Sequence, residues 1–430
     1  MSVQTAAPEL EHEVLAPRSW KTPVLLTVVS VFAIWMCLSL PAGAVSKVSV
    51  DTGNRWLKVI PLSLPSFTAV AVLTILMVAC TAAAWWSAVT RTVKVGRIRL
   101  SLWIGVGYGT FFVAAFLLWA VAGRGALQLT ALLFGSLFLS VPLVFGAMSG
   151  TVCERVGVIN VAIEGQLLGG AFLAAVIGSA TGNPWIGLLA APVAGALIGA
   201  LLALFAVRYW VDNIIVSVVL NVLVTGLTSY LFSTVMTNNK DLLMTPVRLP
   251  TWRIPVLSEI PVVGPVLFAQ NALVYIMYAG VVVLQIMLFR SRWGLRLRAC
   301  GEHPRAADTV GIKVNLTRVV NTIIGGAIAG LGGAFFTVAN GLAFGKSMSA
   351  GRGYIALAAM ILGGWKPKGA IVAALLFGFA DNLQNSLGVV GVQVPSQFML
   401  MAPYLVTIFA VAGLVGRVRP PAMEGKPYKG

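Results

Sequence analysis

Three polar side chains interrupt an apolar stretch near the middle of the chain: Asn160, Glu164 and Gln166, within GVINVAIEGQLLGG at residues 157–170. A carboxylate and two amides in apolar surroundings can bind a polar solute, and an ionisable residue there is a candidate functional site. Four-residue spacing places Asn160 and Glu164 on one face if the segment is helical. The alternative is that Glu164 accepts hydrogen bonds from backbone at a broken helix end.

Two further polar groups have the same character. Asn221 belongs to a stripe of polar residues that recur every four positions: Ser217, Asn221, Thr225 and Ser229. Such a stripe lines a hydrophilic path or hydrogen-bonds to a neighbouring helix. Asp381, one helical turn before Asn385, is either a pathway residue or part of a solvated helix end. The candidate substrate-pathway residues are therefore Asn160, Glu164, Gln166, Asn221 and Asp381.

A charged segment runs from Arg290 to Arg318 in a chain of which only 10% is charged. Within it, Gly301 is expected to break one helical run, and Pro304 to start a short helix that ends at Gly311. A short helix with small residues on one face and charges on the other suits docking into a groove. A solvated interfacial loop is the alternative. The candidate docking residues are Gly301, Glu302, Pro304, Arg305, Ala306, Ala307, Asp308 and Gly311.

Other chemistries find no support in the sequence. GLAFGKS at Gly341–Ser347 approaches a phosphate-binding loop, but it has one residue too few between its glycines and follows no expected strand. Four scattered cysteines and two histidines predict neither a disulfide framework nor a metal site. We find no catalytic constellation, and therefore expect no cofactor and no enzymatic activity in this chain.

The composition predicts the fold class. The chain has 430 residues, 58% of them hydrophobic, and a mean hydropathy of +0.92. Such a sequence is typical of an all-α, polytopic transmembrane helical bundle, and its apolar runs do not alternate as barrel strands do. The expected apolar segments are residues 22–41, 66–89, 101–121, 129–149, 160–180, 185–207, 213–236, 273–290, 318–340, 354–365, 369–387 and 397–416.

The basic residues predict the orientation. The net charge of +17 is read as the cytoplasmic excess of Lys and Arg, because no aromatic-interleaved basic patch indicates nucleic acid. Placing both termini in the cytoplasm puts most of these residues inside. We then expect four parts: a cytoplasmic arm at residues 1–21, peripheral N-terminal helices at 22–128, a core at 129–416 with the charged loop 290–318, and a cytoplasmic tail at 417–430. The first span is expected to be retained, not cleaved as a signal peptide.

Three stretches are irregular. Residues 157–170 and 351–369 combine glycines with polar or proline residues, which predicts interrupted or re-entrant helices. Such helices occur at membrane depth only where they are buried in protein or line a cavity. The loop Thr237–Asn271 carries prolines that block a continuous helix, so we expect an outer surface loop or a docking face.

At the charged segment the sequence becomes familiar. Leu297–Ile312, LRACGEHPRAADTVGI, resembles the cytoplasmic coupling segment of ABC importer permeases of the branched-chain amino acid, simple sugar and nucleoside group. Residues 157–171, 325–333 and 351–369 are similar to three further motifs of that group. The resemblance covers about residues 130–416, and the outer run IPVLSEIPVVGPVLFAQN is most similar to the nucleoside and simple-sugar subset. Cys300 and His303 depart from the residues usual in the group.

The resemblance implies a division of labour. This chain would be the pore subunit, in the lipid of a bacterial cytoplasmic membrane, for a small polar solute: nucleosides first, a simple sugar or branched-chain amino acid as alternatives. A separate ATPase subunit would bind residues 302–311. A second permease chain, similar or identical to this one, would complete the pore. An extracytoplasmic substrate-binding lipoprotein would deliver the solute. Two other classes of protein remain as alternatives. An ion-coupled secondary transporter would use Glu164 and Asp381 as its coupling carboxylates. A membrane-embedded enzyme ranks last, because the sequence has no recognisable catalytic constellation.

Overall fold

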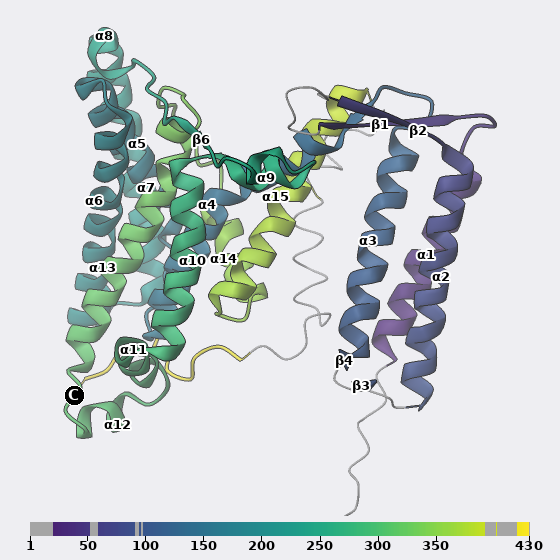
Figure 1. The fold of residues 1–430 in the computed structure, drawn as a ribbon. Coiled ribbons are helices and arrows are strands. Elements are labelled where there is room, and N and C mark those ends of the chain that lie inside the picture. The colour runs from purple at the N-terminus through teal and green to yellow at the C-terminus, as the bar shows by residue number, and fades with distance from the viewer. Residues whose placement is uncertain are drawn as a thin grey trace, which may run out of the picture. The chain divides into compact units, whose positions relative to one another are not determined.

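The structure, a computed structural model, describes residues 20–51, 59–90, 94–95, 98–391, 401 and 419–429. The chain divides into two compact units, one of residues 1–48, 61–127 and 390–392, the other of residues 49–60, 128–389 and 393–430. The described part contains nine helices long and apolar enough to cross a membrane. The prediction of an all-α polytopic bundle is therefore confirmed (Figure 1).

The first unit is a three-helix group. Its helices are α1 (Lys21–Leu38), α2 (Ser66–Thr90) and α3 (Leu100–Ala120). Buried hydroxyls link them: Ser30 Oγ lies 2.9 Å from Thr81 Oγ1 and 3.0 Å from Tyr108 Oη. Short strands accompany the helices, with β1 (Val45–Asp51) between β2 (Val59–Pro65) and β5 (Leu127–Gln128), and β3 (Lys94–Val95) antiparallel to β4 (Ile98–Arg99).

Within the described residues, the second unit holds seven further long helices. They are α4 (Leu129–Arg155), α5 (Ile163–Thr181), α6 (Pro184–Ala203), α7 (Asn213–Leu231), α10 (Ala272–Arg290), α13 (Val314–Gly333) and α15 (Pro367–Val390). All of them except α15 are among the nine candidate spans. The same unit contains the shorter helices α11 (Arg292–Glu302), α12 (Pro304–Thr309) and α14 (Arg352–Leu362). Local signals fix several starts. Asn183 caps α6 ahead of Pro184, and Asp212 accepts the backbone amides of Ile214 and Ile215 at the start of α7.

Glycines set the spacing of the central pair, α6 and α13. A Cβ on Gly195 would collide with the backbone of Gly326 and Gly330, and a Cβ on Gly330 would collide with Gly195. Small residues let helix backbones approach where lipid supplies no hydrophobic drive for association. In contrast, a Cβ on Gly105 or Gly109 in α3 would meet no atom within 4 Å. Among the described residues, the same sequence spacing therefore brings two helices together in one place and makes no such contact in the other.

The boundaries correct several expectations. The span expected at 129–149 continues as α4 to Arg155, and the one expected at 160–180 starts only at Ile163. The 11-residue α14 is too short to be a candidate span, as expected for an interrupted helix. Residues 397–416 lie almost wholly outside the described residues, so the last expected span is not tested.

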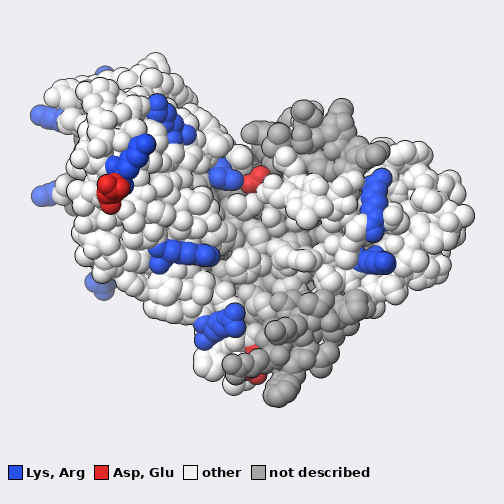
Figure 2. Space-filling view, turned by 90° about the horizontal axis from the view of Figure 1, so that it is seen from above, with Lys and Arg blue, Asp and Glu red and all other residues white. Residues whose placement is uncertain are grey.

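The proline-rich loop forms no long helix, as predicted. It contains α8 (Lys240–Leu243), β6 (Thr251–Arg253), α9 (Val263–Phe268) and β7 (Ala269–Asn271), and β6 pairs antiparallel with β7. Seen from the α8 end, the surface is mostly uncharged, with separate Lys and Arg side chains and fewer acidic ones (Figure 2).

Candidate functional site

A carboxylate from α5 holds the start of the short helix α14. Glu164 Oε1 accepts hydrogen bonds from Ser349 Oγ at 2.6 Å and from the Gly351 amide at 2.8 Å, and Oε2 accepts from the Gly353 amide at 2.7 Å. The first amides of a helix have no acceptor within it, and a negative charge there is favoured by the helix dipole. Glu164 therefore caps α14, as in the broken-helix alternative for this residue.

Gly353 permits this contact. A Cβ at this position would lie 2.8 Å from Glu164 Oε2 and would collide with the Glu164 backbone. Any larger residue would force α14 away from α5. The glycine in this motif is thus required by close approach of two backbones.

Two residues at the end of α4 hold the other end of α14. Glu154 Oε2 accepts a hydrogen bond from Trp365 Nε1 at 2.6 Å. Arg155 donates to the carbonyl of Trp365 at 3.0 Å and to that of Gly364 at 3.4 Å. These partners form the turn between α14 and α15. We call Glu154, Arg155 and Glu164 the α14 clamp.

The break between α4 and α5 has its own hydrogen-bond network. Asn160 Nδ2 donates to Gln166 Oε1 at 3.0 Å and to Ser149 Oγ at 3.1 Å, and Gln166 Nε2 donates to Asn160 Oδ1 at 3.2 Å. Both amide side chains are fully buried. The predicted shared face of Asn160 and Glu164 is wrong, because α5 begins only at Ile163. Asn160 instead stabilises the non-helical turn.

Asn221 ties α7 to this break and to α14. Its Oδ1 accepts the Gly165 amide at 2.8 Å, and its Nδ2 donates to the Val161 carbonyl at 3.0 Å and to Tyr354 Oη at 3.2 Å. The polar stripe on α7 therefore includes at least one residue that bonds to neighbouring segments.

Asp381 pairs with the first residue of α14. Its Oδ2 lies 3.3 Å from Arg352 Nη2, with both side chains partly exposed. Asp381 lies inside α15 and not at its end. Among the candidate pathway residues, Glu164, Asn221 and Asp381 thus all contact α14 or the residues just before it. Asn160 and Gln166 instead form a buried pair with each other, at the break between α4 and α5.

Sequence reasoning missed Glu154, Arg155 and Trp365. Glu154 is only 2% exposed, yet the expected span ended at residue 149 and left it in a loop. A signal was present. Two adjacent charges, Glu154 and Arg155, follow a long apolar run and stand just ahead of Val156 and Gly157, which indicates a helix end.

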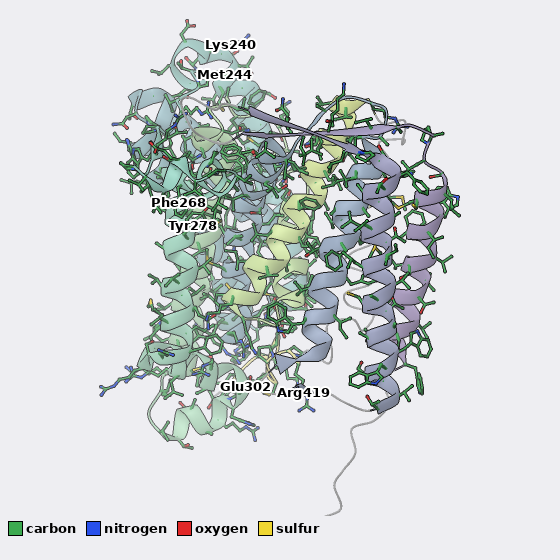
Figure 3. The ribbon with its side chains drawn as sticks, turned by 45° about the vertical axis from the view of Figure 1, so that its right-hand side comes forward. Lys240, Met244, Phe268, Tyr278, Glu302 and Arg419 are labelled. Atoms are coloured by element: carbon green, nitrogen blue, oxygen red, sulfur yellow. The ribbon has the colours of Figure 1, made fainter. Side chains whose placement is uncertain are left out.

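The docking residues lie at the end of the bundle opposite α8. Figure 3 shows Glu302 at one end and Lys240 at the other. α12 starts with Pro304 in its first turn and ends before Gly311, whose φ is +83°, as predicted. Gly301 does not break the preceding helix, which continues to Glu302. A Cβ on Gly301 would collide with the Arg155 carbonyl, so this glycine serves the contact between α11 and the end of α4.

One face of α12 is buried and the other is exposed. Pro304 and Ala307 are buried, whereas Arg305, Ala306 and Asp308 are exposed. Val310, just after the helix, is 74% exposed. The exposed side of this segment thus carries charged side chains beside one apolar residue.

Comparison with known proteins now decides the family. Residues 132–412 match the family described as the permease component of branched-chain amino acid transport systems. The chain belongs to this family. It is a multi-pass membrane permease subunit of an ABC importer, and both its glycine-rich breaks and its charged segment lie inside the matched residues.

Three relatives are nucleoside transporter subunits by name. The guanosine ABC transporter permease protein NupQ of Bacillus subtilis is 36% identical over 302 residues, 68% of this chain and 94% of NupQ. The nucleoside ABC transporter permease protein NupC of Lactococcus lactis is 37% identical over 305 residues, again 68% and 94% of the two chains. The guanosine ABC transporter permease protein NupP of Bacillus subtilis is 25% identical over 288 residues, 65% of this chain and 82% of NupP. No solved structure matches the chain significantly.

Proposed function

We propose that this chain forms the membrane pathway of an ABC importer for nucleosides, in a bacterial cytoplasmic membrane with α11 and α12 in the cytoplasm. The names of NupQ and NupC support the solute class. One observation carries the mechanism. The end of α4 contacts the coupling segment at Gly301 and also binds the turn after α14 through Glu154 and Arg155.

This connection gives a route from ATP hydrolysis to the pathway. An ATPase subunit bound to α12 would move α11, to which α12 is joined directly. Because α11 packs without space against the Arg155 carbonyl, its movement displaces the end of α4. Arg155 and Glu154 then shift the turn at Trp365, and α14 moves relative to Glu164. Packed elements with two arrangements can carry such coupling over long distances.

The proposed pathway follows the polar groups around α14. Asn221, Tyr354, Arg352 and Asp381 carry partly exposed or hydrogen-bonding groups that suit the hydroxyls and base of a nucleoside. In this proposal Glu164, Asn160 and Gln166 hold the broken helices in shape and act on the solute indirectly. A lipoprotein that delivers the solute would bind the opposite end, which carries α8 and the β6–β7 hairpin.

A second permease chain completes the pore in this proposal, and the relatives indicate which kind. In Bacillus subtilis two different chains, NupQ and NupP, both bear the name guanosine ABC transporter permease protein. This chain is 36% identical to NupQ but only 25% identical to NupP. We propose that its partner is a separate, NupP-like chain and not a second copy. Co-expression of two differently tagged copies would recover both tags together if the pore were a homodimer.

Reconstitution tests the function directly. The chain, its partner permease and the co-purifying ATPase are placed in proteoliposomes, and uptake of radiolabelled guanosine is measured with ATP and the binding protein. We expect uptake only when all components are present. Uptake by this chain alone under a proton or sodium gradient would instead identify a secondary transporter. Unlabelled guanosine, ribose and leucine are added as competitors of this uptake. If ribose or leucine inhibits it and unlabelled guanosine does not, the proposed solute class is wrong.

A further inference from the structure

The C-terminal residues 419–429 are folded onto the coupling segment. The Met423 amide donates to the Gly301 carbonyl at 2.9 Å, and the Ala422 amide donates to Glu302 Oε2 at 3.2 Å. Tyr428 Oη lies 3.0 Å from Asp308 Oδ2 and donates to it. The tail therefore contacts both α11 and α12.

Further contacts fix the tail to the bundle itself. Arg318 Nη1 donates to the Lys426 carbonyl at 2.8 Å, and the Gly425 amide donates to the Gly157 carbonyl at 3.1 Å. Arg318 is only 3% exposed, so this bond lies in a buried setting where hydrogen bonds are strong. Lys429 Nζ lies 5.2 Å from the centre of the Trp210 ring. These contacts hold the tail in a fixed position on the surface of the bundle.

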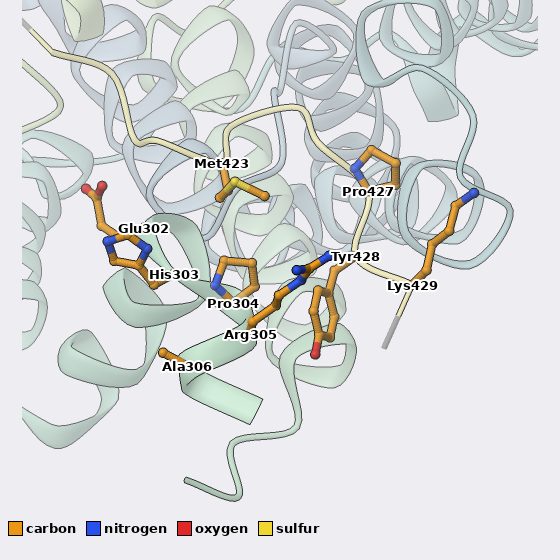
Figure 4. Close-up of a pocket in the computed structure, with 9 residues that line it drawn as sticks. All are labelled: Glu302, His303, Pro304, Arg305, Ala306, Met423, Pro427, Tyr428 and Lys429. Carbon is orange, nitrogen blue, oxygen red and sulfur yellow. The ribbon is translucent and has the colours of Figure 1, made fainter. Parts of the chain in front are cut away.

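The tail and the coupling segment enclose a cleft of about 600 Å³. One wall is formed by residues 302–306, and the other by Met423, Pro427, Tyr428 and Lys429 (Figure 4). Arg305 and Tyr428 lie side by side across it in this view. A volume of this size holds several side chains of a partner, and its lining combines charged residues with apolar ones.

The charges of the lining indicate the chemistry of the occupant. Arg305 and Lys429 are cations, His303 is a third basic side chain, and Glu302 is the single carboxylate of the lining. Glu302 already accepts a tail amide. The apolar groups are Pro304, Met423 and the Tyr428 ring. An apolar side chain next to a carboxylate on the partner would match this cleft.

We propose that the C-terminal tail is half of the ATPase-docking surface: an apolar side chain flanked by a carboxylate, on the ATPase subunit, enters the cleft between the tail and α12. This rests on the proposed function, because it assumes that an ATPase binds α12. The cleft is continuous with the exposed side of that helix, so a partner on α12 meets the tail as well. The tail thus widens a six-residue helix into a two-walled socket.

Two matched substitutions in the tail test the socket. Met423→Glu places a carboxylate inside the cleft, whereas Lys426→Glu makes a larger charge change at an exposed residue that does not line it. Each variant is co-expressed with the ATPase and the partner permease, and the ATPase recovered per tagged chain is measured. We expect about a tenfold loss for Met423→Glu, as for a central interface residue, and less than about a twofold change for Lys426→Glu. Equal recovery for both variants would overturn the proposal.

A crosslink separates docking from mere support of α12. A photoreactive benzoyl-phenylalanine at position 428 should crosslink to the ATPase, and the same group at position 426 should not. Loss of ATPase in Met423→Glu without a crosslink from 428 would show that the tail only stabilises the permease, and would refute the socket.

Val310→Asp, on α12 but outside the cleft, tests the proposed function independently. If Val310→Asp removes the ATPase while Met423→Glu keeps it, the docking of the ATPase on α12 is supported and the socket is refuted. If neither variant affects recovery, both the docking on α12 and the socket are wrong.

Discussion

The amide of Gly353 donates a hydrogen bond to Glu164 Oε2 at 2.7 Å, although the two residues are 189 positions apart in the chain. Gly353 belongs to the irregular segment 351–369 and Glu164 to the irregular segment 157–170, and the contact brings these two segments together. The most conspicuous carboxylate in the apolar sequence is thereby a helix cap. Its three acceptor contacts leave little capacity to bind an ion, which weighs against a coupling role for Glu164.

Removing the cap should destabilise the protein. Glu164→Ala leaves two backbone amides and the Ser349 hydroxyl without their acceptor, at a cost of about 1–3 kcal/mol for each group that stays buried and unpaired. Glu164→Gln keeps one acceptor oxygen and should lose less. We expect the melting temperature of the purified protein to fall in the order wild type, Gln, Ala. A Gln variant with unchanged melting temperature but no uptake would instead indicate a direct role for the carboxylate in transport.

Glycines with the same sequence spacing should differ sharply in how well they tolerate substitution by alanine. Gly195→Ala places a methyl group against the α13 backbone and should reduce the amount of folded protein severalfold, because the helices must separate. Gly109→Ala, in open space, should be neutral or slightly stabilising through its higher helix propensity. Fluorescence-detected size-exclusion chromatography of both variants measures this. Equal losses would show that α3 packs against something outside this chain.

Weakening the contact between α4 and the Trp365 turn should uncouple the ATPase. Arg155→Lys keeps the charge but loses the fork that reaches two carbonyls. We expect normal co-purification of the ATPase, with guanosine uptake reduced about tenfold at a similar rate of ATP hydrolysis. Arg292→Lys, on α11, is the matched control. Loss of ATPase binding in Arg155→Lys would place this residue in docking and not in transmission.

The C-terminal tail, residues 419–429, should bind the rest of the chain more weakly as the pH rises. Burial raises the pKa of the Glu424 carboxyl above its ordinary value, and a hydrogen bond with Glu154 lowers it by less. The docked tail therefore favours the protonated form. Docking is strongest below the ordinary pKa, about 4.5, and weakens as the pH climbs to the raised pKa. Glu424→Gln stays neutral, so its tail should be better protected from hydrogen exchange at neutral pH and should lose less protection as the pH rises. A wild-type tail equally protected at pH 4 and pH 8 would contradict the prediction.

The ion pair between Arg352 and Asp381 should contribute little stability. Their side chains are 25% and 35% exposed, and such pairs contribute at most about 1 kcal/mol. A double-mutant cycle with Arg352→Gln and Asp381→Asn should give a coupling energy of that size in thermal unfolding. Transport should respond more strongly if these groups face the solute: we expect KM for guanosine to rise severalfold in each single variant. An unchanged KM in both would remove them from the pathway.

Part of the site could be predicted because its signals are local. Pro304 and Gly311 fix the ends of α12 through their backbone preferences, and prolines in Thr237–Asn271 exclude a long helix. The same local reasoning predicts a helix break at Gly301, and this prediction is wrong because α11 continues to Glu302. A glycine can break a helix or permit close packing, and only the position of Arg155 decides between these.

The sequence by itself determined the membrane fold class, the breaks at residues 157–170 and 351–369, and the family, because apolar length, glycine, proline and motif order are properties of neighbouring residues. Only the tertiary structure decided what the polar residues bind. It paired Glu164 with α14, joined Asn160 to Gln166, placed Glu154 beneath Trp365 and folded the tail onto α12. Hydrogen bonds and close backbone approach depend on atoms brought together from distant parts of the chain, and spacing along the sequence does not encode those distances.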